Sequence, residues 1–217
     1  KLISELLYEL YWDFDPSIQK VEGEYAITGT IDKTRVCIKA LGRSTAGSPQ
    51  TYSRIEMTSD DFPSAMTLKP EDGNTKLWKL VEGSDQETGD EFFDAEVLVQ
   101  GGAAAVMANL DEHTREAILD MVVKGISLED GLLCYERWGY FDSIGDVIEV
   151  VGLMGVVAGK LRKGSKDSLE SRLLKNVRRD SNPEVRARNL APLELNFGSS
   201  SVLQRALRAI LGNWVRL

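Results

Sequence analysis

Alternating apolar and polar positions mark the first half of the chain as rich in β-strands. Two runs with many β-branched residues, 24–31 and 34–40, are separated only by Asp32 and Lys33, and this short spacing predicts a β-hairpin. The segment that follows, 42–50, is rich in Gly, Ser and Thr, which predicts an exposed loop. The pattern therefore predicts antiparallel strands in this part of the chain.

Further strands are expected after this loop. Residues 51–57 alternate again, and 65–68 form a short strand candidate that Pro70 closes. Residues 93–99 are also predicted to be a strand, because apolar residues occupy every second position. Residues 126–140 predict a second hairpin, since their Asp-Gly dipeptide tolerates the positive φ of a tight turn.

Helical periodicity lies on both sides of these strands and between them. An amphipathic helix is expected at 2–12 and a short helix at 74–81. Asp111 is placed to accept hydrogen bonds from the first backbone N–H groups of another helix. Ser143 is expected to cap a long apolar helix that ends near Arg162. Helices are therefore expected to cover the sheet.

The end of the chain is patterned entirely as helix. Gly164 and its Lys and Ser neighbours form a linker, after which Ser168 can cap the first of three helices. Pro183 opens the second helix, because a proline in the first turn loses no hydrogen bond. Gly198 ends that helix, and the last amphipathic helix is expected at 202–211.

These elements predict an α+β fold in two parts, an α+β domain at 1–163 and a helical segment at 165–217. Charge divides the chain near the same place. Residues 159–217 hold 13 basic and 5 acidic residues, a net charge of +8, whereas the preceding residues hold 13 basic and 29 acidic residues, a net charge of −16. Such a chain either docks one part on the other or presents two different surfaces to partners.

One segment of the tail, Asp180-Ser-Asn-Pro-Glu-Val-Arg-Ala-Arg-Asn-Leu190, carries a family pattern. It resembles the start of a HEAT repeat, in which Asp-x-x-Pro-x-Val-Arg opens an apolar helix that a second helix follows. Asp180, Pro183, Val185, Arg186 and Leu190 fall on this pattern. The resemblance implies an α-helical HEAT-like tail in which the Asp and Arg bridge adjacent repeats and stacked helices bind a partner.

The front of the chain carries a looser resemblance. The run at 89–101 and the following helix with Asp111 and Arg115 are similar to uncharacterised bacterial proteins that place an α+β domain before HEAT-like repeats. Two features depart from the family. One full repeat is present where solenoids need about three, and Pro192 lies inside its first helix, where it should kink or end the helix. We therefore expect the tail to pack on the front domain or to continue into further repeats.

Candidate reactive groups are few. Cys37 and Cys134 lie within strand-like runs, and we expect buried free thiols rather than a disulfide or a nucleophile. His113, the only histidine, has neither an orienting partner nor a nucleophile nearby in the sequence, so we interpret it as a surface residue. The acidic loop at 82–94 lacks EF-hand spacing, and Gly101-Gly102 is expected to be a plain strand-to-helix turn. We predict no catalytic residue, no metal site and no cofactor.

The predicted function is that of a non-catalytic protein–protein interaction or scaffold protein which uses a HEAT-like helical surface. The candidate partner-binding residues are four arginines of the basic tail, Arg186, Arg188, Arg205 and Arg208. Their charge favours an acidic protein partner. The chain shows no signal peptide and no apolar run of about 20 residues, so we expect a cytoplasmic protein without membrane insertion.

Two alternatives stay open at this point. One is an enzyme of unknown reaction that uses acidic residues of the front domain, such as Asp90 and Asp94. The other is a nucleic-acid binder that uses the basic tail. The second is less favoured, because the tail has only Phe197 and Trp214 for stacking on bases and the whole chain has a net charge of −8. The oligomeric state is not predicted.

Overall fold

The computed structural model describes residues 17–21, 24–45, 48–71, 85–165, 167–201 and 203–204. The helices expected at 2–12 and 74–81 lie outside the described residues. So does the helix expected at 202–211, apart from Leu203 and Gln204, which are helical.

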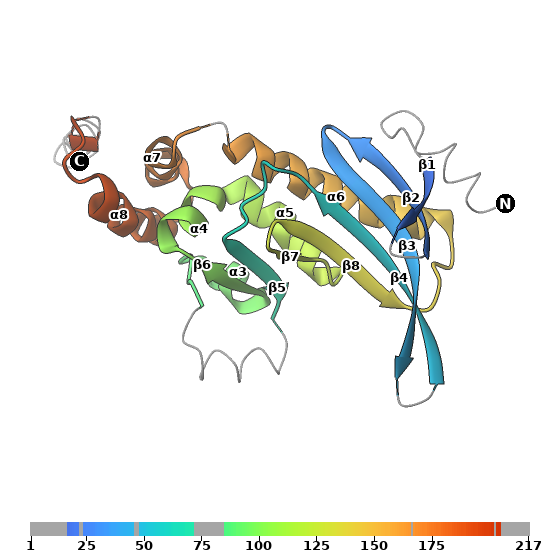
Figure 1. Cartoon of the computed structure of the whole chain (residues 1–217). Coiled ribbons are helices and arrows are strands. Elements are labelled where there is room, and N and C mark those ends of the chain that lie inside the picture. Colours follow the sequence, from blue (N-terminus) through green and yellow to red (C-terminus); the bar gives the residue numbers. More distant parts are fainter. Residues whose placement is uncertain are drawn as a thin grey trace.

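The predicted α+β fold is confirmed. Within the described residues, eight strands form one antiparallel sheet in the order β1-β2-β3-β4-β8-β7-β5-β6 (Figure 1). The strands are β1 Ser17–Val21, β2 Glu24–Ile31, β3 Thr34–Thr45, β4 Ser48–Thr58, β5 Met66–Pro70, β6 Val97–Gly101, β7 Ser127–Glu129 and β8 Leu132–Trp138. The hairpin of β7 and β8 therefore joins the first four strands to β5 and β6.

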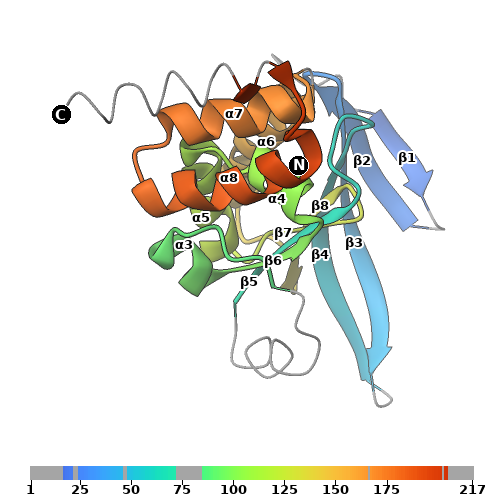
Figure 2. The same cartoon turned by 90° about the vertical axis from the view of Figure 1, so that its left-hand side faces the viewer.

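The described helices are α3 Glu91–Glu96, α4 Ala103–Asn109, α5 Glu112–Val123, α6 Ile144–Ser165, α7 Leu169–Arg179 and α8 Pro183–Phe197. Helices α5 and α6 pack on each other and on the sheet, and α7 and α8 pack on each other and on α4. The last two helices consequently lie away from the sheet, with α4 beside them (Figure 2).

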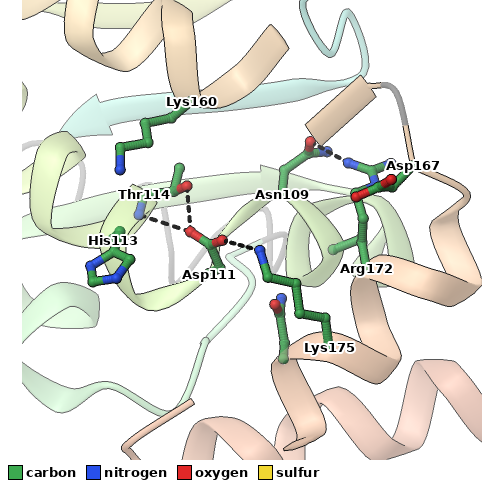
Figure 3. A pocket seen from close by; sticks show the side chains of 10 residues that line it. Asn109, Asp111, His113, Thr114, Lys160, Asp167, Arg172 and Lys175 are labelled. Atoms are coloured by element: carbon green, nitrogen blue, oxygen red, sulfur yellow. Dashed lines mark hydrogen bonds and ion pairs between the residues drawn. The ribbon is translucent and has the colours of Figure 1, made fainter. Parts of the chain in front are cut away.

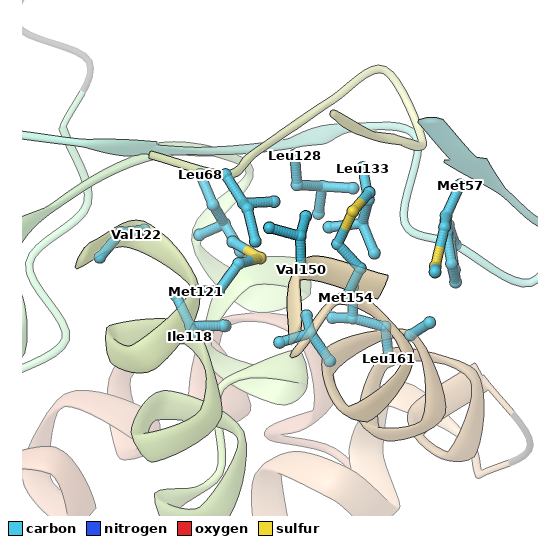
Figure 4. Packing of buried hydrophobic residues seen from close by; sticks show 14 of the residues in the cluster. Met57, Leu68, Ile118, Met121, Val122, Leu128, Leu133, Val150, Met154 and Leu161 are labelled. Atoms are coloured by element: carbon cyan, nitrogen blue, oxygen red, sulfur yellow. The ribbon is translucent and has the colours of Figure 1, made fainter. Parts of the chain in front are cut away.

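Two apolar clusters hold these layers together. In the larger one, Leu68 and Leu133 of the sheet face Met121 of α5 and Met154 of α6, and all four are fully buried (Figure 4). The smaller one joins α4 to the tail, and its buried members are Met107, Ala108, Leu173, Val177, Val185, Leu193 and Leu203. The tail thus packs on the front of the chain, while the domain division at 163–165 stays a prediction.

Backbone geometry confirms both predicted hairpins. Asp32 and Lys33 have φ values of 47° and 67° between β2 and β3, as a two-residue type I′ turn requires. Asp130 and Gly131 have φ values of 50° and 75° between β7 and β8. In both cases a short polar dipeptide reverses the chain, which is why the hairpins could be predicted from local sequence.

The prediction of an exposed loop at 42–50 is wrong. Strand β3 continues to Thr45 and β4 begins at Ser48, so the two strands pair without interruption as far as these residues. The paired ends extend from the sheet as a two-stranded arm (Figure 1). Backbone hydrogen bonds between strands do not require apolar side chains, so Gly, Ser and Thr could form this arm without an alternating pattern.

The prediction of a continuous strand at 93–99 is wrong in its first half. Residues 91–96 form helix α3, and the strand begins at Val97. A side-chain oxygen of Asp90 accepts a hydrogen bond from the backbone N–H of Phe93 at 3.3 Å, which caps the helix. Phe93 is the buried residue of α3, and a single apolar anchor fits a short helix as well as a strand.

The predicted helix starts are confirmed, but two expected breaks are not. Asp111 caps α5 and Ser168 caps α7 through their side chains. Gly164, expected in a linker, lies inside α6, which continues to Ser165. Pro192 does not end α8, which continues to Phe197. The proline cannot donate a backbone hydrogen bond within the helix, but its side chain is buried and the helix continues for five more residues.

Arg115 connects the tail to the front of the chain through a buried ion network. Its Nη1 and Nη2 atoms donate to the two carboxylate oxygens of Asp180 at 2.9 and 3.2 Å, and its Nε atom donates to Asp90 at 3.0 Å. Nη1 also donates to the carbonyl oxygen of Leu110 at 2.9 Å. Only 3% of the Arg115 side chain and 1% of the Asp180 side chain are exposed, so water does not replace these bonds.

Asp180 is the first residue of the HEAT-like pattern, and its partner Arg115 lies on α5, in the front part of the chain. Asp180 also accepts a hydrogen bond from the backbone N–H of Asn182 at 3.1 Å, which shapes the turn between α7 and α8. Burial alone would lower the pKa of Arg115, but hydrogen bonds and charge attraction from Asp180 and then Asp90 outweigh it and raise the pKa. The guanidinium is therefore charged at every physiological pH.

Replacing Arg115 with Met should destabilise the protein strongly. The substitution leaves the buried Asp180 carboxylate without its cation, and breaking a buried pair in this way costs about 3–5 kcal/mol. The free energy of unfolding, measured by denaturant titration, should fall by that amount. The control is Arg137→Met, which removes solvent-exposed ion pairs to Asp142 and Asp146 and a contact over the Phe141 ring. It should lower the free energy of unfolding by no more than about 1 kcal/mol. Equal effects of the two variants would contradict a buried network.

Candidate interaction surface

Helix α7 has one buried and one exposed side. Leu173, Asn176 and Val177 are buried, because residues three or four apart share a helix face. Arg178 and Arg179 are exposed near the end of the helix, where positive charge is favourable beside the free carbonyl groups. Within the described residues, neither arginine has an acidic partner. The helix therefore presents two unpaired guanidinium groups on a rigid support.

The four arginines selected from the sequence differ in their surroundings. The Nη1 atom of Arg186 donates to the carbonyl oxygens of Asp180 at 2.8 Å and Ser181 at 3.2 Å, so Arg186 closes the end of α7. Arg188 donates to Glu87 at 3.0 Å and to Glu184 at 3.4 Å. Arg205 and Arg208 lie outside the described residues. Arg186 thus supports the α7–α8 turn, and Arg188 lies where α8 meets the front part of the chain, at Glu87.

Gly89 lies in close contact with α8, where the tail meets the front part of the chain. Gly89 has a φ of 90°, and a Cβ atom added to it would lie 2.9 Å from Cγ of Glu184 in α8. The carbonyl oxygen of Gly89 accepts a hydrogen bond from the Asn182 side chain at 3.3 Å. The position requires glycine both for its backbone angle and for the approach of α8.

The two acids of the enzyme alternative have structural hydrogen bonds. Asp94 accepts from the backbone N–H and the hydroxyl of Thr88 at 2.9 and 2.8 Å and from the backbone N–H of Gly89 at 3.0 Å. Asp90 caps α3 and pairs with Arg115. Their oxygens shape the loop that receives α8, and neither acid lines the cavity described next.

A cavity of about 240 Å³ lies where α4, α5, α6 and α7 approach one another (Figure 3). Its lining residues are Ala108, Asn109, Asp111, His113, Thr114, Lys160, Asp167, Arg172, Lys175 and Asn176. His113 is exposed, and its Nδ1 atom lies 3.2 Å from Glu116, which confirms the prediction of a surface histidine. Sequence reasoning did not single out this cavity, because its basic residues come from two helices on either side of a turn.

Cys37 and Cys134 are thiols that form no disulfide with each other, and both are less buried than expected. Both are half-buried, and strand register places Cys37 and Cys134 on either side of Glu56. Two strand spacings amount to about 9.6 Å, beyond the reach of about 7 Å that a disulfide allows. Burial raises the pKa of Cys134, and the positive charge of Arg54 only partly opposes it. A raised pKa disfavours the nucleophilic thiolate.

Within the part of the chain that the structure describes, no three or more His, Cys, Asp or Glu side chains are grouped so that they could hold a metal ion. Among the same residues, no helix has the length and hydropathy needed to cross a bilayer.

No family model matches this sequence, and no curated protein or solved structure is significantly similar to it. The resemblance to HEAT repeats therefore depends on the motif at 180–190 alone and stays a prediction.

Replacing Asp111 with Ala should destabilise the protein in a pH-dependent way. The carboxylate accepts from the Thr114 N–H at 3.0 Å, the Thr114 hydroxyl at 2.7 Å and Lys175 at 3.2 Å. Burial raises the pKa of Asp111, but the bonds from Thr114 and Lys175 outweigh it and leave the pKa lowered. The charged form thus stabilises the fold above about pH 4, the ordinary value for Asp, and this contribution is lost as the pH falls through the lowered pKa.

At pH 7 the free energy of unfolding of Asp111→Ala should be lower than that of the wild type by about 1 kcal/mol. This difference should become smaller as the pH falls below about 4. Denaturant titrations at several pH values measure it. The matched control is Ser168→Ala, which removes the cap of α7 without removing a titratable group. The loss of unfolding free energy that it causes should therefore not change with pH. A deficit of Asp111→Ala that stayed constant down to the same pH would contradict the assigned role of the carboxylate.

Proposed function

We propose that the protein is a non-catalytic interaction protein which binds an acidic segment of a protein partner through the exposed basic side of the α7–α8 hairpin. The observation that carries this proposal is that Arg178 and Arg179 are exposed and have no acidic partner within the described residues. Arginine is enriched at protein interfaces, and its planar fork binds a carboxylate through two hydrogen bonds.

The support beneath these arginines favours binding. The opposite side of α7 is buried in the cluster that contains Leu173 and Val177, and the turn after α7 is fixed by Asp180 and Arg186. A surface that is already ordered loses little conformational entropy on binding. The α7–α8 hairpin is therefore a pre-formed docking surface under this proposal.

Charge favours an acidic protein over a nucleic acid. Part of the positive charge of the tail is neutralised by the front domain, through Lys175 with Asp111 and Arg188 with Glu87. The whole chain has a net charge of −8, which opposes long-range attraction to a polyphosphate backbone. A local contact with a few carboxylates remains favourable, because it depends on the unpaired arginines alone.

The four arginines selected from the sequence keep separate places in this proposal. Arg188 is a contact residue at the edge of the basic side, and Arg186 supports that side by closing α7. Arg205 and Arg208 stay predicted contact residues outside the described part of the chain.

Reversing the charge of Arg178 and Arg179 should abolish partner binding. The double variant Arg178→Glu, Arg179→Glu and the wild type are each used to purify partners from the source cells, and the captured proteins are quantified by mass spectrometry. An acidic protein should be captured by the wild type and lost with the variant. With purified partner, we expect the dissociation constant of the double variant to be at least tenfold higher than that of the wild type, which corresponds to about 1.4 kcal/mol. We also expect the dissociation constant of the wild type to rise as the salt concentration is raised.

The matched control reverses two exposed basic residues at the other end of the molecule, Lys33→Glu and Arg35→Glu. This control has the same change in net charge, so it should retain the partner. A partner that is lost equally from both double variants would show a response to total charge, and a partner retained by both would show binding elsewhere. Either result would overturn the proposal.

A further inference from the structure

Helix α6 has an exposed apolar side that faces away from the sheet. Val150 and Met154 are buried and point from α6 toward the sheet (Figure 4). On the opposite side of the helix, Ile148 and Val156 are 36% and 54% exposed, and residues 150–159 include no charged residue. The outer side of a helix that packs on a sheet normally carries charged or polar residues. The outer side of α6 is instead suited to contact with another apolar surface.

Three glycines lie on this outer side and leave the backbone uncovered. A Cβ atom added to Gly152, Gly155 or Gly159 would meet no atom of the described residues within 4 Å. Glycine in the middle of a helix is destabilising relative to alanine, and packing among the described residues gives no reason for it here. The absence of side chains does allow a second helix to approach the α6 backbone closely.

Large and small residues alternate along the same side. Ile148, Gly152, Val156 and Gly159 follow one another at spacings of four, four and three residues, which keeps them on one face of the helix. If two copies of α6 run antiparallel and cross near residue 154, Val156 of each copy meets Gly152 of the other. Large side chains then fit against small ones across the contact, so the face is complementary in shape to itself.

The charges at the two ends of α6 favour an antiparallel pair. Residues 142–149 hold three acidic residues and no basic ones, whereas residues 160–163 hold three basic residues and no acidic ones. Glu149 and Lys160 are 11 residues apart, which is about three helical turns, so both lie on one flank of the outer side. In an antiparallel pair, Glu149 of each copy lies opposite Lys160 of the other. A parallel pair would bring like charges together.

Both of these flanking residues are available for such a contact. Lys160 forms no ion pair with the described residues. It lines the cavity shown in Figure 3, and its flexible stem lets the ammonium group reach the outer flank as well. Glu149 pairs with Lys124, and their side chains are 53% and 42% exposed. An exposed pair of this kind contributes little to stability, so Glu149 loses little by turning to a second lysine.

We infer that the outer side of α6, formed by Ile148, Gly152, Gly155, Val156 and Gly159, is a homodimer interface in which the α6 helices of two copies pack antiparallel. The same patch is used by both subunits, as a closed two-fold dimer requires. One helix pair lies at the low end of the about 1,200–2,000 Å² that specific interfaces bury, so we expect a dissociation constant in the micromolar range. The interface lies outside the α7–α8 hairpin and does not depend on the proposed partner binding.

Sedimentation equilibrium of the full chain, at concentrations that span the micromolar range, tests this interface. The wild type should follow a reversible monomer–dimer equilibrium. Val156→Asp should raise the dissociation constant by about tenfold or more, because the contact would bury two unpaired carboxylates. The matched control is Ile18→Asp, since Ile18 lies on β1 and is also 54% exposed. It makes the same change in charge and should leave the dissociation constant unchanged.

Gly152→Ala separates loss of contact from loss of stability. Its new Cβ atom has open space within the described residues, and alanine is the better helix former. The unfolding midpoint in denaturant, measured at a protein concentration below the dissociation constant, should therefore rise. The dissociation constant of the dimer should rise severalfold, because the two backbones can no longer approach as closely. This variant keeps the test decisive if Val156→Asp does not fold.

A charge exchange tests the antiparallel direction. Glu149→Lys and Lys160→Glu should each weaken the dimer, because each places like charges opposite one another. The double variant Glu149→Lys, Lys160→Glu has the net charge of the wild type and restores opposite charges at both ends of the pair. Its dissociation constant should return toward that of the wild type.

Four outcomes would overturn the inference. The first is a wild type that stays monomeric throughout the concentration range. The second is a dimer that Val156→Asp and Gly152→Ala leave unchanged. The third is a dimer that Ile18→Asp weakens as much as Val156→Asp does. The fourth is a double charge variant that is no stronger than either single variant. None of these outcomes bears on whether Arg178→Glu, Arg179→Glu loses a protein partner, so the two proposals can fail separately.

Discussion

A guanidinium group enclosed by three chain segments determines how the helical half of this protein is arranged. Arg115 lies 25 residues from Asp90 and 65 residues from Asp180 along the chain, yet one side chain binds both. A buried charge is tolerated only when its hydrogen bonds are made. The start of α3, helix α5 and the α7–α8 turn are therefore held in one arrangement, and the surface and cavity of α7 depend on it.

Distribution of charge links this arrangement to function. An acidic front and a basic tail allow two responses, neutralisation within the chain or attraction of something outside it. The structure contains neutralised pairs, such as Lys175 with Asp111, beside exposed cations that form no ion pair with the described residues, such as Arg178 and Arg179. The neutralised pairs hold the tail on the front of the chain. The exposed cations are the ones that the proposed acidic partner would contact.

Sequence reasoning succeeded where local chemistry decides structure. The caps Asp111 and Ser168 act on N–H groups within one turn, and both were predictable. The prediction of a loop at 42–50 failed, because paired strands that extend beyond the core do not need alternating apolar and polar residues. Sequence reasoning also missed the partner of Asp180. The HEAT-like motif indicates that this acid forms an ion pair, but it does not identify Arg115 as the partner. Basic residues of the tail were visible in the sequence, but which of them are already paired depends on distant segments.

The position of the second hairpin in the sheet has a consequence for the order of folding. Strand β4 pairs with β8, so Ser53 meets the carbonyl oxygen of Gly139, 86 residues further on. Strands β1 to β4 can pair as each leaves the ribosome, because each contacts its neighbour in sequence. The exposed edge of β4 must then wait until β8 has been synthesised. Closing so large a loop is slow, and in the interval the edge of β4 is open to pairing with another nascent chain.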